Sequence, residues 1–432
     1  MVKESRTTCP ALFVCAPASG QGKTTVTAGM ARYHRQRGRD VRVFKTGPDY
    51  LDPLILEQAS GNPVAQLDLW MVGKEECRQI IYQAACEADL VLVEGVMGMF
   101  DGDPSGADMA HYFGIPIAIV IDARSMAQTF GAIALGLATH RKELQVAGVI
   151  ANNLGSRRHQ DLITHAMPSG LRLLGGIHRH PQACLPERHL GLVHPHEVGD
   201  IEQRLDSLAG IMFNAGLCQL PGPVEFTPGS ETRPDRLLDG VRIGIARDPA
   251  FTFIYAANVR LLEDMGATCV YFSPLKDSEL PEVDALWLPG GYPELHLHTL
   301  ANNHEMRQQI KDFHGSGKKI LAECGGMLYL MESLTDVSGD RAAMIGILPG
   351  NGIMRDRGGC QGMQTAPLPQ GEVRAHAHHR TRCENTTEPV AYGRRARHPA
   401  AGEPVYQVGN VTASYLHLYF PSNPGAIAGV LR

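Results

Sequence analysis

Short apolar runs alternate with longer segments of helical character along most of the chain. In the first half, the runs of strand length are residues 11–16, 41–44, 90–93, 117–121 and 146–151. A turn or a helical segment follows each of them, and residues 23–37 are the clearest example. Because parallel strands need a crossover connection, usually a helix, this alternation predicts an α/β domain with a doubly wound, mostly parallel sheet.

The alternation weakens after about residue 200 and then restarts. Between residues 220 and 239 prolines, glycines and charged residues cluster, which is typical of a linker. Further strand-like runs are residues 241–246, 268–272, 285–288 and 319–322. We therefore predict a first domain over residues 1–220, a linker over 221–240 and a second α/β domain over 241–432.

Composition narrows the class of protein. Of 432 residues, 44% are hydrophobic and 20% charged, and the net charge of −5 favours neither a nucleic-acid nor an anionic-membrane partner. No apolar run approaches the roughly 18–20 residues of a transmembrane helix. The ten cysteines show no paired spacing, which is typical of reduced thiols, and the polar first ten residues do not resemble a signal peptide. We expect a cytoplasmic protein.

The first candidate site is a glycine-rich loop after the first strand. Glycines let main-chain N–H groups turn toward a phosphate, a lysine reaches the terminal phosphates, and the following hydroxyl can bind Mg²⁺. The candidate ATP-binding residues are Gly20, Gln21, Gly22, Lys23, Thr24 and Thr25. Pro17 stands where the longer form of this loop has its first glycine. Ala18 occupies the position of the extra lysine of partition-type ATPases, which argues against that class.

Acidic residues after two later strands complete this prediction. Asp49 and Glu94 each follow an apolar run, at the strand ends where α/β proteins bind ligands. Together with Thr24 they are the candidate ligands of an ATP-bound Mg²⁺, which takes one or two carboxylates besides phosphates and water. Asp101 is a further candidate, although it equally fits a turn beside Gly102.

The second candidate site is Cys324, between a predicted strand and a predicted helix. A strand–nucleophile–helix elbow exposes the side chain, and the helix N-terminus is expected to lower the thiol pKa. Gly325 offers an oxyanion its N–H, and the turn at Gly290 and Gly291 offers the second donor. His417, on an apolar strand near the end of the chain, is the candidate base.

These motifs together resemble one family. Pro289-Gly-Gly-Tyr-Pro-Glu294, Cys324-Gly-Gly and Ala413-Ser-Tyr-Leu-His417 follow a Gly-x-Gly-Lys-Thr-Thr loop and Gly47-Pro-Asp-Tyr50 in the first domain. In this order, over nearly the whole chain, they resemble the corrin a,c-diamide synthases, which amidate cobyrinic or hydrogenobyrinic acid in cobalamin biosynthesis.

The resemblance implies a division of labour. The first domain resembles dethiobiotin synthetase and would use MgATP to phosphorylate a side-chain carboxylate, with Tyr50 and Asp101 lining the acyl-phosphate site. The second resembles a flavodoxin-like class I glutamine amidotransferase, whose cysteine releases ammonia to displace the phosphate. The implied small molecules are ATP, L-glutamine and a corrinoid polycarboxylate. A homodimer is suggested by the resemblance alone.

Two departures from the family pattern stand out. Tyr419 occupies the position where ordinary class I amidotransferases carry a glutamate that orients the histidine, so the site is predicted as a Cys–His dyad without an identified third member. Ala375 and His378 replace a glycine and a phenylalanine, and the alanine would be strained if its backbone needed a positive φ. The histidines at 376, 378 and 379 leave a metal site open as an alternative.

Two alternative functions remain at this point. The motifs are shared with other tetrapyrrole amidotransferases, such as cobyric acid synthase or nickel-sirohydrochlorin a,c-diamide synthase. A regulatory or partition ATPase without amidation activity is the alternative from a different class, and the second domain argues against it.

Overall fold

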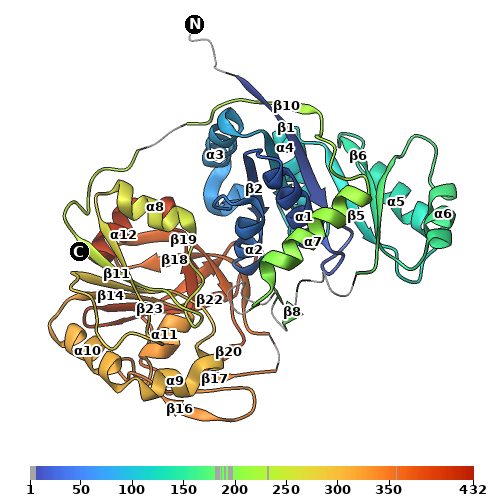
Figure 1. Cartoon of the computed structure of the whole chain (residues 1–432). Helices are drawn as coiled ribbons and strands as arrows, with labels where there is room; N and C mark the ends of the chain where they lie inside the picture. The colour runs from blue at the N-terminus through green and yellow to red at the C-terminus, as the bar shows by residue number, and fades with distance from the viewer. Residues whose placement is uncertain are drawn as a thin grey trace, which may run out of the picture. The chain divides into compact units, whose positions relative to one another are not determined.

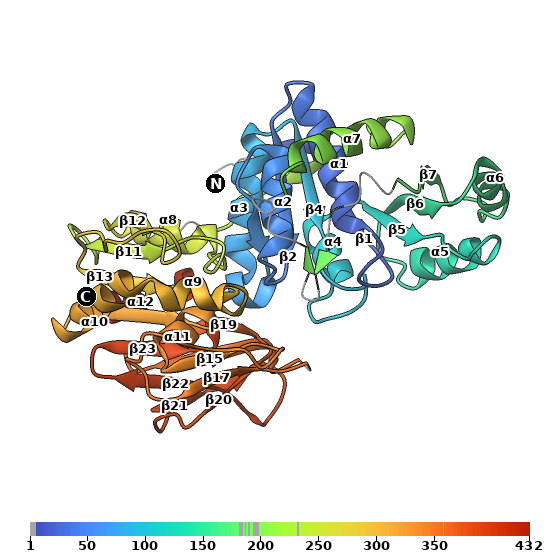
Figure 2. The same cartoon turned by 60° about the horizontal axis from the view of Figure 1, so that its bottom comes forward.

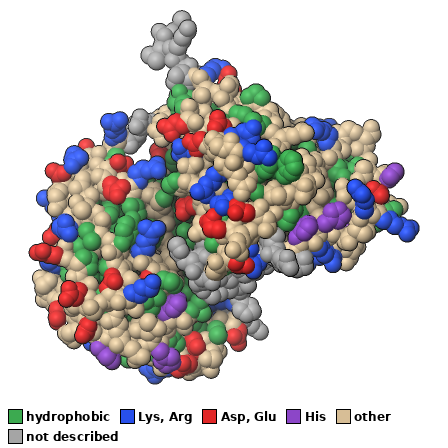
Figure 3. Space-filling view, in the orientation of Figure 1, with side chains coloured by type: hydrophobic (Ala, Val, Ile, Leu, Met, Phe, Trp, Pro, Cys, Tyr) green, Lys and Arg blue, Asp and Glu red, His purple; other side chains and the backbone are tan. Residues whose placement is uncertain are grey.

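The chain folds into two compact units, Met1–Glu231 and Thr232–Arg432 (Figure 1). This computed structural model describes residues 6–180, 185, 187–188, 191–192, 198–230, 233–356 and 358–432. Within them, no helix is both long and apolar enough to cross a membrane. On the face in Figure 3, basic and acidic side chains are interspersed over both units.

The first unit is built on an eight-stranded sheet in which β1 lies between β4 and β5. Its order is β3-β2-β4-β1-β5-β6-β7, with all these neighbours parallel. The strands are β1 (Thr7–Cys15), β2 (Val41–Thr46), β3 (Ala65–Leu67), β4 (Leu90–Glu94), β5 (Ile117–Asp122), β6 (Val146–Leu154), β7 (Leu173–His178) and the additional β10 (Pro223–Phe226). A separate pair is formed by β8 (Glu187–Arg188) and β9 (Gly191–Leu192).

Helices connect the parallel strands. They are α1 (Lys23–Gln36), α2 (Leu51–Ser60), α3 (Lys74–Glu87), α4 (Gly106–Phe113), α5 (Thr129–Thr139) and α6 (Arg157–His165), with a π-helical turn at Leu69–Gly73. A further helix, α7 (Ile201–Asn214), precedes the antiparallel strand β10. Helices α1 and α7 lie side by side over the sheet (Figures 1 and 2). Gly29 permits this approach, because a Cβ there would lie 2.7 Å from Met212 Cγ. The central strands β4 and β5 are buried along their whole length, as parallel strands covered on both faces must be.

The strand β10 differs from the sequence expectation for this region. Residues 223–226 were expected to lie in the linker, but they pair antiparallel with Thr7–Pro10 of β1. Buried and exposed side chains alternate within Pro223–Phe226, two of each, as expected for a strand paired at an edge. The prolines in this segment indicated a linker, so the strand was not predicted from the sequence. The first unit therefore extends beyond residue 220.

The second unit contains a ten-stranded mixed sheet in the order β12-β11-β13-β14-β23-β22-β21-β18-β19-β24. The neighbours from β12 to β23 are parallel and those from β23 to β24 antiparallel. Its strands are β11 (Arg242–Ala246), β12 (Thr268–Phe272), β13 (Ala285–Leu288), β14 (Lys319–Glu323), β18 (Gln361–Leu368), β19 (Gly371–His378), β21 (Ala391–Arg395), β22 (Ala401–Val408), β23 (Val411–Ser414) and β24 (Leu416–Leu418).

The described part of this unit also contains a smaller sheet and five α-helices. The smaller sheet contains β15 (Ser333–Thr335), β16 (Arg341–Ala343), β17 (Asn351–Met354) and β20 (Thr381–Glu384). The helices are α8 (Ala256–Asp264), α9 (Leu297–Asn302), α10 (His304–Gly315), α11 (Gly325–Leu330) and α12 (Pro424–Leu431), with 3₁₀ turns at Pro293–His296 and Phe420–Ser422. The α/β class predicted for both domains is confirmed. The antiparallel extension was not predicted.

Candidate active sites

The glycine-rich loop of the first unit joins β1 to α1. Gly20 and Gly22 have φ of 75° and 95°, which a residue with a side chain adopts only with strain. Gly22 also lacks room for a side chain, because a Cβ would lie 2.2 Å from Asn152 Nδ2. Gln21 fastens the loop to the neighbouring strands, since its side-chain oxygen accepts from Asp122 N (2.9 Å) and its carbonyl from Asn152 Nδ2 (2.9 Å). The loop thus places the first N–H groups of α1 at the carboxyl end of the sheet, where an anion can bind.

Lys23 and Thr24 begin α1 at this loop, and Thr25 follows in the same turn. Lys23 Nζ donates to the carbonyls of Met97 (2.7 Å) and Ala18 (3.2 Å). Burial, and then the charge of Lys45, lower the pKa of Lys23. The amine is therefore held at the loop in surroundings that favour a bound anion.

A buried cluster of charges lies beside the loop, centred on Lys45. Lys45 and Glu94 are direct partners in the pairing of β2 with β4, and Lys45 Nζ lies 2.5 Å from Glu94 Oε1. The same amine lies 2.7 Å from Asp52 Oδ2 and 3.6 Å from Asp49 Oδ2. Thr24 Oγ1 lies 2.8 Å from Glu94 Oε1 and 3.2 Å from Asp52 Oδ2. Cluster and loop therefore form one site.

The pKa values of this cluster follow from burial and mutual attraction. Burial opposes the charge of Lys45, but Asp52, Glu94 and Asp49 outweigh it and raise its pKa well above the usual value. The pKa of Asp52 is lowered, because Lys45 outweighs burial. Burial raises the pKa of Glu94, and burial together with Asp52 raises that of Asp49 to about 7. The attraction of Lys45 therefore favours the ionised form of Asp52, beside Thr24, while burial opposes it at Glu94 and Asp49.

These residues fit an ATP-bound Mg²⁺. Among the described residues Glu94 Oε2 is buried without a hydrogen-bond partner, so one carboxylate oxygen is available to a cation. A hydroxyl, one or two carboxylates and phosphate oxygens are the ligands that Mg²⁺ takes with nucleotides. Asp52, which the sequence pattern did not indicate, contacts Thr24 Oγ1 through its Oδ2 (3.2 Å). The predicted ligand Asp49 instead accepts from Leu51 N through its Oδ1 at the start of α2 (3.2 Å).

The two remaining candidates of the first unit have different surroundings. Asp101 is exposed, and its Oδ2 accepts from Gly98 N (3.1 Å), closing the turn that carries the Met97 carbonyl bound by Lys23. The turn alternative thus describes its observed contact. Tyr50 is buried and directly precedes α2.

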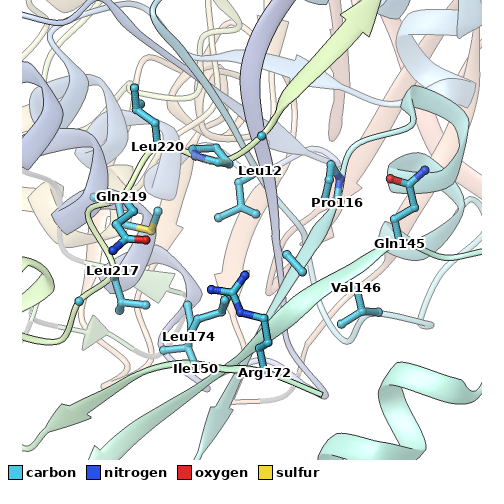
Figure 4. Close-up of a pocket in the computed structure, with 15 residues that line it drawn as sticks. Leu12, Pro116, Gln145, Val146, Ile150, Arg172, Leu174, Leu217, Gln219 and Leu220 are labelled. Atoms are coloured by element: carbon cyan, nitrogen blue, oxygen red, sulfur yellow. The ribbon is translucent and has the colours of Figure 1, made fainter. Parts of the chain in front are cut away.

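A cavity of about 440 Å³ lies elsewhere in this unit (Figure 4). Leu12, Pro116, Val146, Arg172 and Leu217 are among the residues that line it. Pro116, Val146 and Arg172 stand at the amino ends of β5, β6 and β7, whereas the glycine-rich loop follows the carboxyl end of β1. The cavity contains none of the candidate residues.

In the second unit, Cys324 forms the elbow expected between β14 and α11. Its φ of 44° and ψ of −104° mark a strained turn, which its N–H stabilises by donating to Ser414 O (2.7 Å). The expected lowering of the thiol pKa is wrong for this conformation. Burial, followed by the charge of Glu294, raises the pKa of Cys324 far more than the Gly325 N–H lowers it. The thiol is neutral.

The glycine turn at 290–291 packs main chain against main chain on this elbow. A Cβ at Gly325 would lie 2.9 Å from Gly291 N, and one at Gly291 would lie 2.1 Å from Ala250 O. A Cβ at Gly326 would lie 2.0 Å from Leu288 O. The three candidate oxyanion glycines, Gly290, Gly291 and Gly325, therefore stand together beside the nucleophile.

His417 packs against Gly290 of the same turn. A Cβ at Gly290 would lie 2.2 Å from its Cε1 and 2.8 Å from its Nδ1, and the Phe253 ring meets it edge-on at 5.5 Å. Burial, and then His376 and the other nearby histidines, lower the pKa of His417 well below the usual value. A neutral imidazole can accept a proton from a neutral thiol, so the pair fits base-assisted attack rather than a preformed ion pair.

The residues that depart from the family pattern occupy ordinary strand and core positions. Ala375 lies in the extended strand β19 and its φ is not positive, so no glycine is required there. His379 stacks on Tyr415 (3.8 Å, 8°) and its Nε2 lies 3.2 Å from Glu403 Oε2. The described residues include no group of three or more His, Cys, Asp or Glu arranged to hold a metal ion. Tyr419 is buried, with its ring edge-on to Tyr255.

Comparison with known proteins matches each unit to a family. Residues 12–193 match the CobQ/CobB/MinD/ParA nucleotide binding domain, and residues 242–425 match the CobB/CobQ-like glutamine amidotransferase domain. The chain is 51% identical over 424 residues to the hydrogenobyrinate a,c-diamide synthase of Stutzerimonas stutzeri, covering 98% of this chain and 99% of that one. It is 50% identical to the hydrogenobyrinate a,c-diamide synthase of Pseudomonas aeruginosa (98% and 97%) and 44% identical to the cobyrinate a,c-diamide synthase of Herminiimonas arsenicoxydans (97% and 96%).

Proposed function

Because the chain belongs to the family of the hydrogenobyrinate and cobyrinate a,c-diamide synthases, we propose that it converts the a and c carboxylates of a corrinoid acid to amides, using ATP and glutamine. The family resemblance inferred from the motifs is confirmed. A nucleotide-binding domain and a glutamine amidotransferase domain in one chain make it an ATP-dependent, glutamine-using ligase.

The first unit activates the carboxylate. A carboxylate oxygen of the corrinoid attacks the γ-phosphorus of ATP, and ADP leaves. The acyl phosphate formed in this step carries phosphate as a good leaving group. In this proposal the loop N–H groups and Lys23 bind the phosphates, and Thr24, Glu94 and Asp52 would hold Mg²⁺, which would supply charge neutralisation at the phosphates. Lys45 keeps the neighbouring carboxylates close together, as its ion pairs with Asp52, Glu94 and Asp49 support. Asp49 stays a candidate metal ligand, and Tyr50 and Asp101 stay candidates for the acyl-phosphate site.

The second unit supplies the ammonia. Cys324 Sγ attacks the side-chain amide carbon of glutamine, while His417 takes the thiol proton and passes it to the departing nitrogen. The main-chain N–H groups of the Gly290–Gly291 turn and of Gly325 receive the oxyanion. Water then cleaves the thioester to glutamate, and ammonia displaces phosphate from the acyl phosphate. The contact of Gly290 with His417 and of Gly291 with Gly325 supports this assignment.

The observation that carries the proposal is the identity of 50–51% along nearly the whole chain to two hydrogenobyrinate a,c-diamide synthases. The identity of 44% to a cobyrinate enzyme is lower and favours the metal-free acid as substrate. The match of residues 242–425 to a glutamine amidotransferase domain argues against a partition ATPase as the function of this chain.

Mass spectrometry tests the reaction. Purified enzyme with hydrogenobyrinic acid, MgATP and glutamine is expected to give two successive replacements of OH by NH₂. Cobyrinic acid is the matched alternative substrate, and the absence of a mass change with both acids would overturn the proposed substrate. The Cys324→Ala variant is expected to lose glutamine hydrolysis but to form amide from ammonium salts. Persistent glutamine hydrolysis in that variant would refute the nucleophile.

A further inference from the structure

A buried carboxyl group links the strand of the nucleophile to the strand of the base. Glu323 is the last residue of β14, directly before Cys324, and its side chain is 2% exposed. Its Oε1 accepts from the main-chain N–H of Leu418 (2.9 Å), the residue directly after His417. Its Oε2 accepts from Trp287 Nε1 (3.1 Å). One side chain thus fixes the spacing between the two reactive positions.

The strand that carries His417 needs this support. It is only three residues long, and in the described structure its ladder of main-chain pairing is with β19 alone. On its other side the contacts are made by side chains: Glu323 as described, and Asn258, whose Nδ2 donates to Leu418 O (2.8 Å) and whose Oδ1 accepts from Phe420 N (2.8 Å). The position of the His417 main chain therefore depends on the pairing with β19 and on two buried polar side chains.

Burying a carboxyl group at this position costs free energy. Burial raises the pKa of Glu323 to about 8, and an apolar side chain would avoid the desolvation. Both oxygens of Glu323 are used as acceptors, and one of them serves the main chain next to the base. Since no other part of the proposed mechanism uses Glu323, holding the base strand explains its presence.

We propose that Glu323 is a positioning residue that sets His417 against Cys324 by binding the main-chain N–H of Leu418. The inference rests on the proposed glutaminase function. Tyr419 stands where other amidotransferases carry a glutamate that orients the histidine. In this chain Glu323 supplies a carboxyl group that supports the histidine instead. The support acts on the backbone of the base strand rather than on the imidazole ring.

The test compares Glu323→Leu, Glu323→Gln, Trp287→Phe and the double variant Glu323→Gln/Trp287→Phe in the full-length protein. Leucine removes both acceptors, and a displacement of the base of about 1 Å lowers kcat for glutamine hydrolysis about 100-fold. Glutamine has one acceptor oxygen, so its NH₂ group must face either Leu418 N–H or Trp287 Nε1–H. Trp287→Phe removes the second of these donors, and the glutamine oxygen can then bind Leu418 alone.

The expected result is a lower kcat for glutamine hydrolysis in Glu323→Leu and Glu323→Gln, with KM for glutamine unchanged, and recovery of kcat in the double variant toward that of Trp287→Phe. Amide formation from ammonium salts is expected to stay at the wild-type rate. The matched control is Asp284→Asn, since Asp284 Oδ2 also accepts a main-chain N–H, from Arg242 (2.8 Å), at the amino end of β13.

Three outcomes would overturn the proposal: kcat of Glu323→Leu within threefold of wild type, a double variant no faster than Glu323→Gln, or a rise in KM with kcat unchanged. If Glu323→Leu does not fold, thermal melting reveals it, and the two glutamine variants decide. Failure of the proposed function is read separately, on the wild type, as the absence of glutamine hydrolysis or of amide formation.

Discussion

A methyl group at Gly290 should disable the glutaminase chiefly by displacing His417. In Gly290→Ala the new Cβ would lie 2.2 Å from His417 Cε1 and 2.8 Å from Nδ1, whereas carbon atoms in contact are about 3.5–4.0 Å apart. The φ of Gly290 is not positive, so alanine fits the backbone there. The ring must therefore retreat by more than about 1 Å, and a displacement of this size costs about 100-fold in the rate of the chemical step.

The assay measures glutamate release and, separately, amide formation with glutamine or with ammonium salts. We expect Gly290→Ala to lose glutamine-dependent activity and to keep ammonia-dependent activity. The matched control is Gly315→Ala at the end of α10, where a Cβ meets nothing within 4 Å. A glutamine-dependent kcat within threefold of wild type would refute the placement of His417 as the base. Loss of both activities would show that the turn supports the whole protein instead.

Three further predictions concern charge and metal. Lys45→Met should abolish ATP-dependent amidation and lower the free energy of unfolding by about 3–5 kcal/mol at neutral pH, because Asp52 and Glu94 would lose their buried partner. Unfolding in urea measures this loss, and a smaller loss is expected at pH 5, where the carboxylates can take up protons. Burial raises the pKa of Glu323 to about 8, above the value of about 4.5 in the unfolded state, so the stability that Glu323 contributes is fully present below about pH 4.5 and is lost as the pH rises to about 8. The urea midpoint of Glu323→Gln should therefore fall less across this window than that of the wild type. Equal slopes for the two proteins would contradict the raised pKa. Thr24→Val should raise the Mg²⁺ concentration needed for amidation and leave glutamine hydrolysis unchanged, whereas an unchanged Mg²⁺ requirement would remove Thr24 from the metal site.

The features that the sequence predicted well are contiguous along the chain. The glycine-rich loop before Lys23 and the elbow at Cys324 each join a strand to a helix within a few residues, so spacing alone indicates their shape. The α/β class follows from the same local alternation. Burial of Cys324, by contrast, comes from elements distant in sequence, and for that reason the direction of its pKa shift could not be predicted.

The roles of Lys45 and Glu323 depend on strand register, which periodicity does not specify. Lys45 faces Glu94 only because β2 pairs with β4 in one alignment, and Glu323 reaches Leu418 only because the chain returns beside β14 after about ninety residues. Both residues stand next to motifs that were recognised, but as members of apolar strands they gave no signal of their own. Ala375 shows the reverse case, since an extended strand accommodates alanine where the family pattern suggested a special glycine.

The pairing of β1 with β10 has a practical consequence for producing the first unit by itself. Residues Thr7–Pro10 of β1 pair with Pro223–Phe226, while the parallel neighbours β4 and β5 pair with residues 11–15. A recombinant fragment that stops at residue 220 would leave the first half of β1 as an open edge, which invites aggregation. During translation the same edge stays open until Phe226 has left the ribosome, although the phosphate-binding loop is made some two hundred residues earlier.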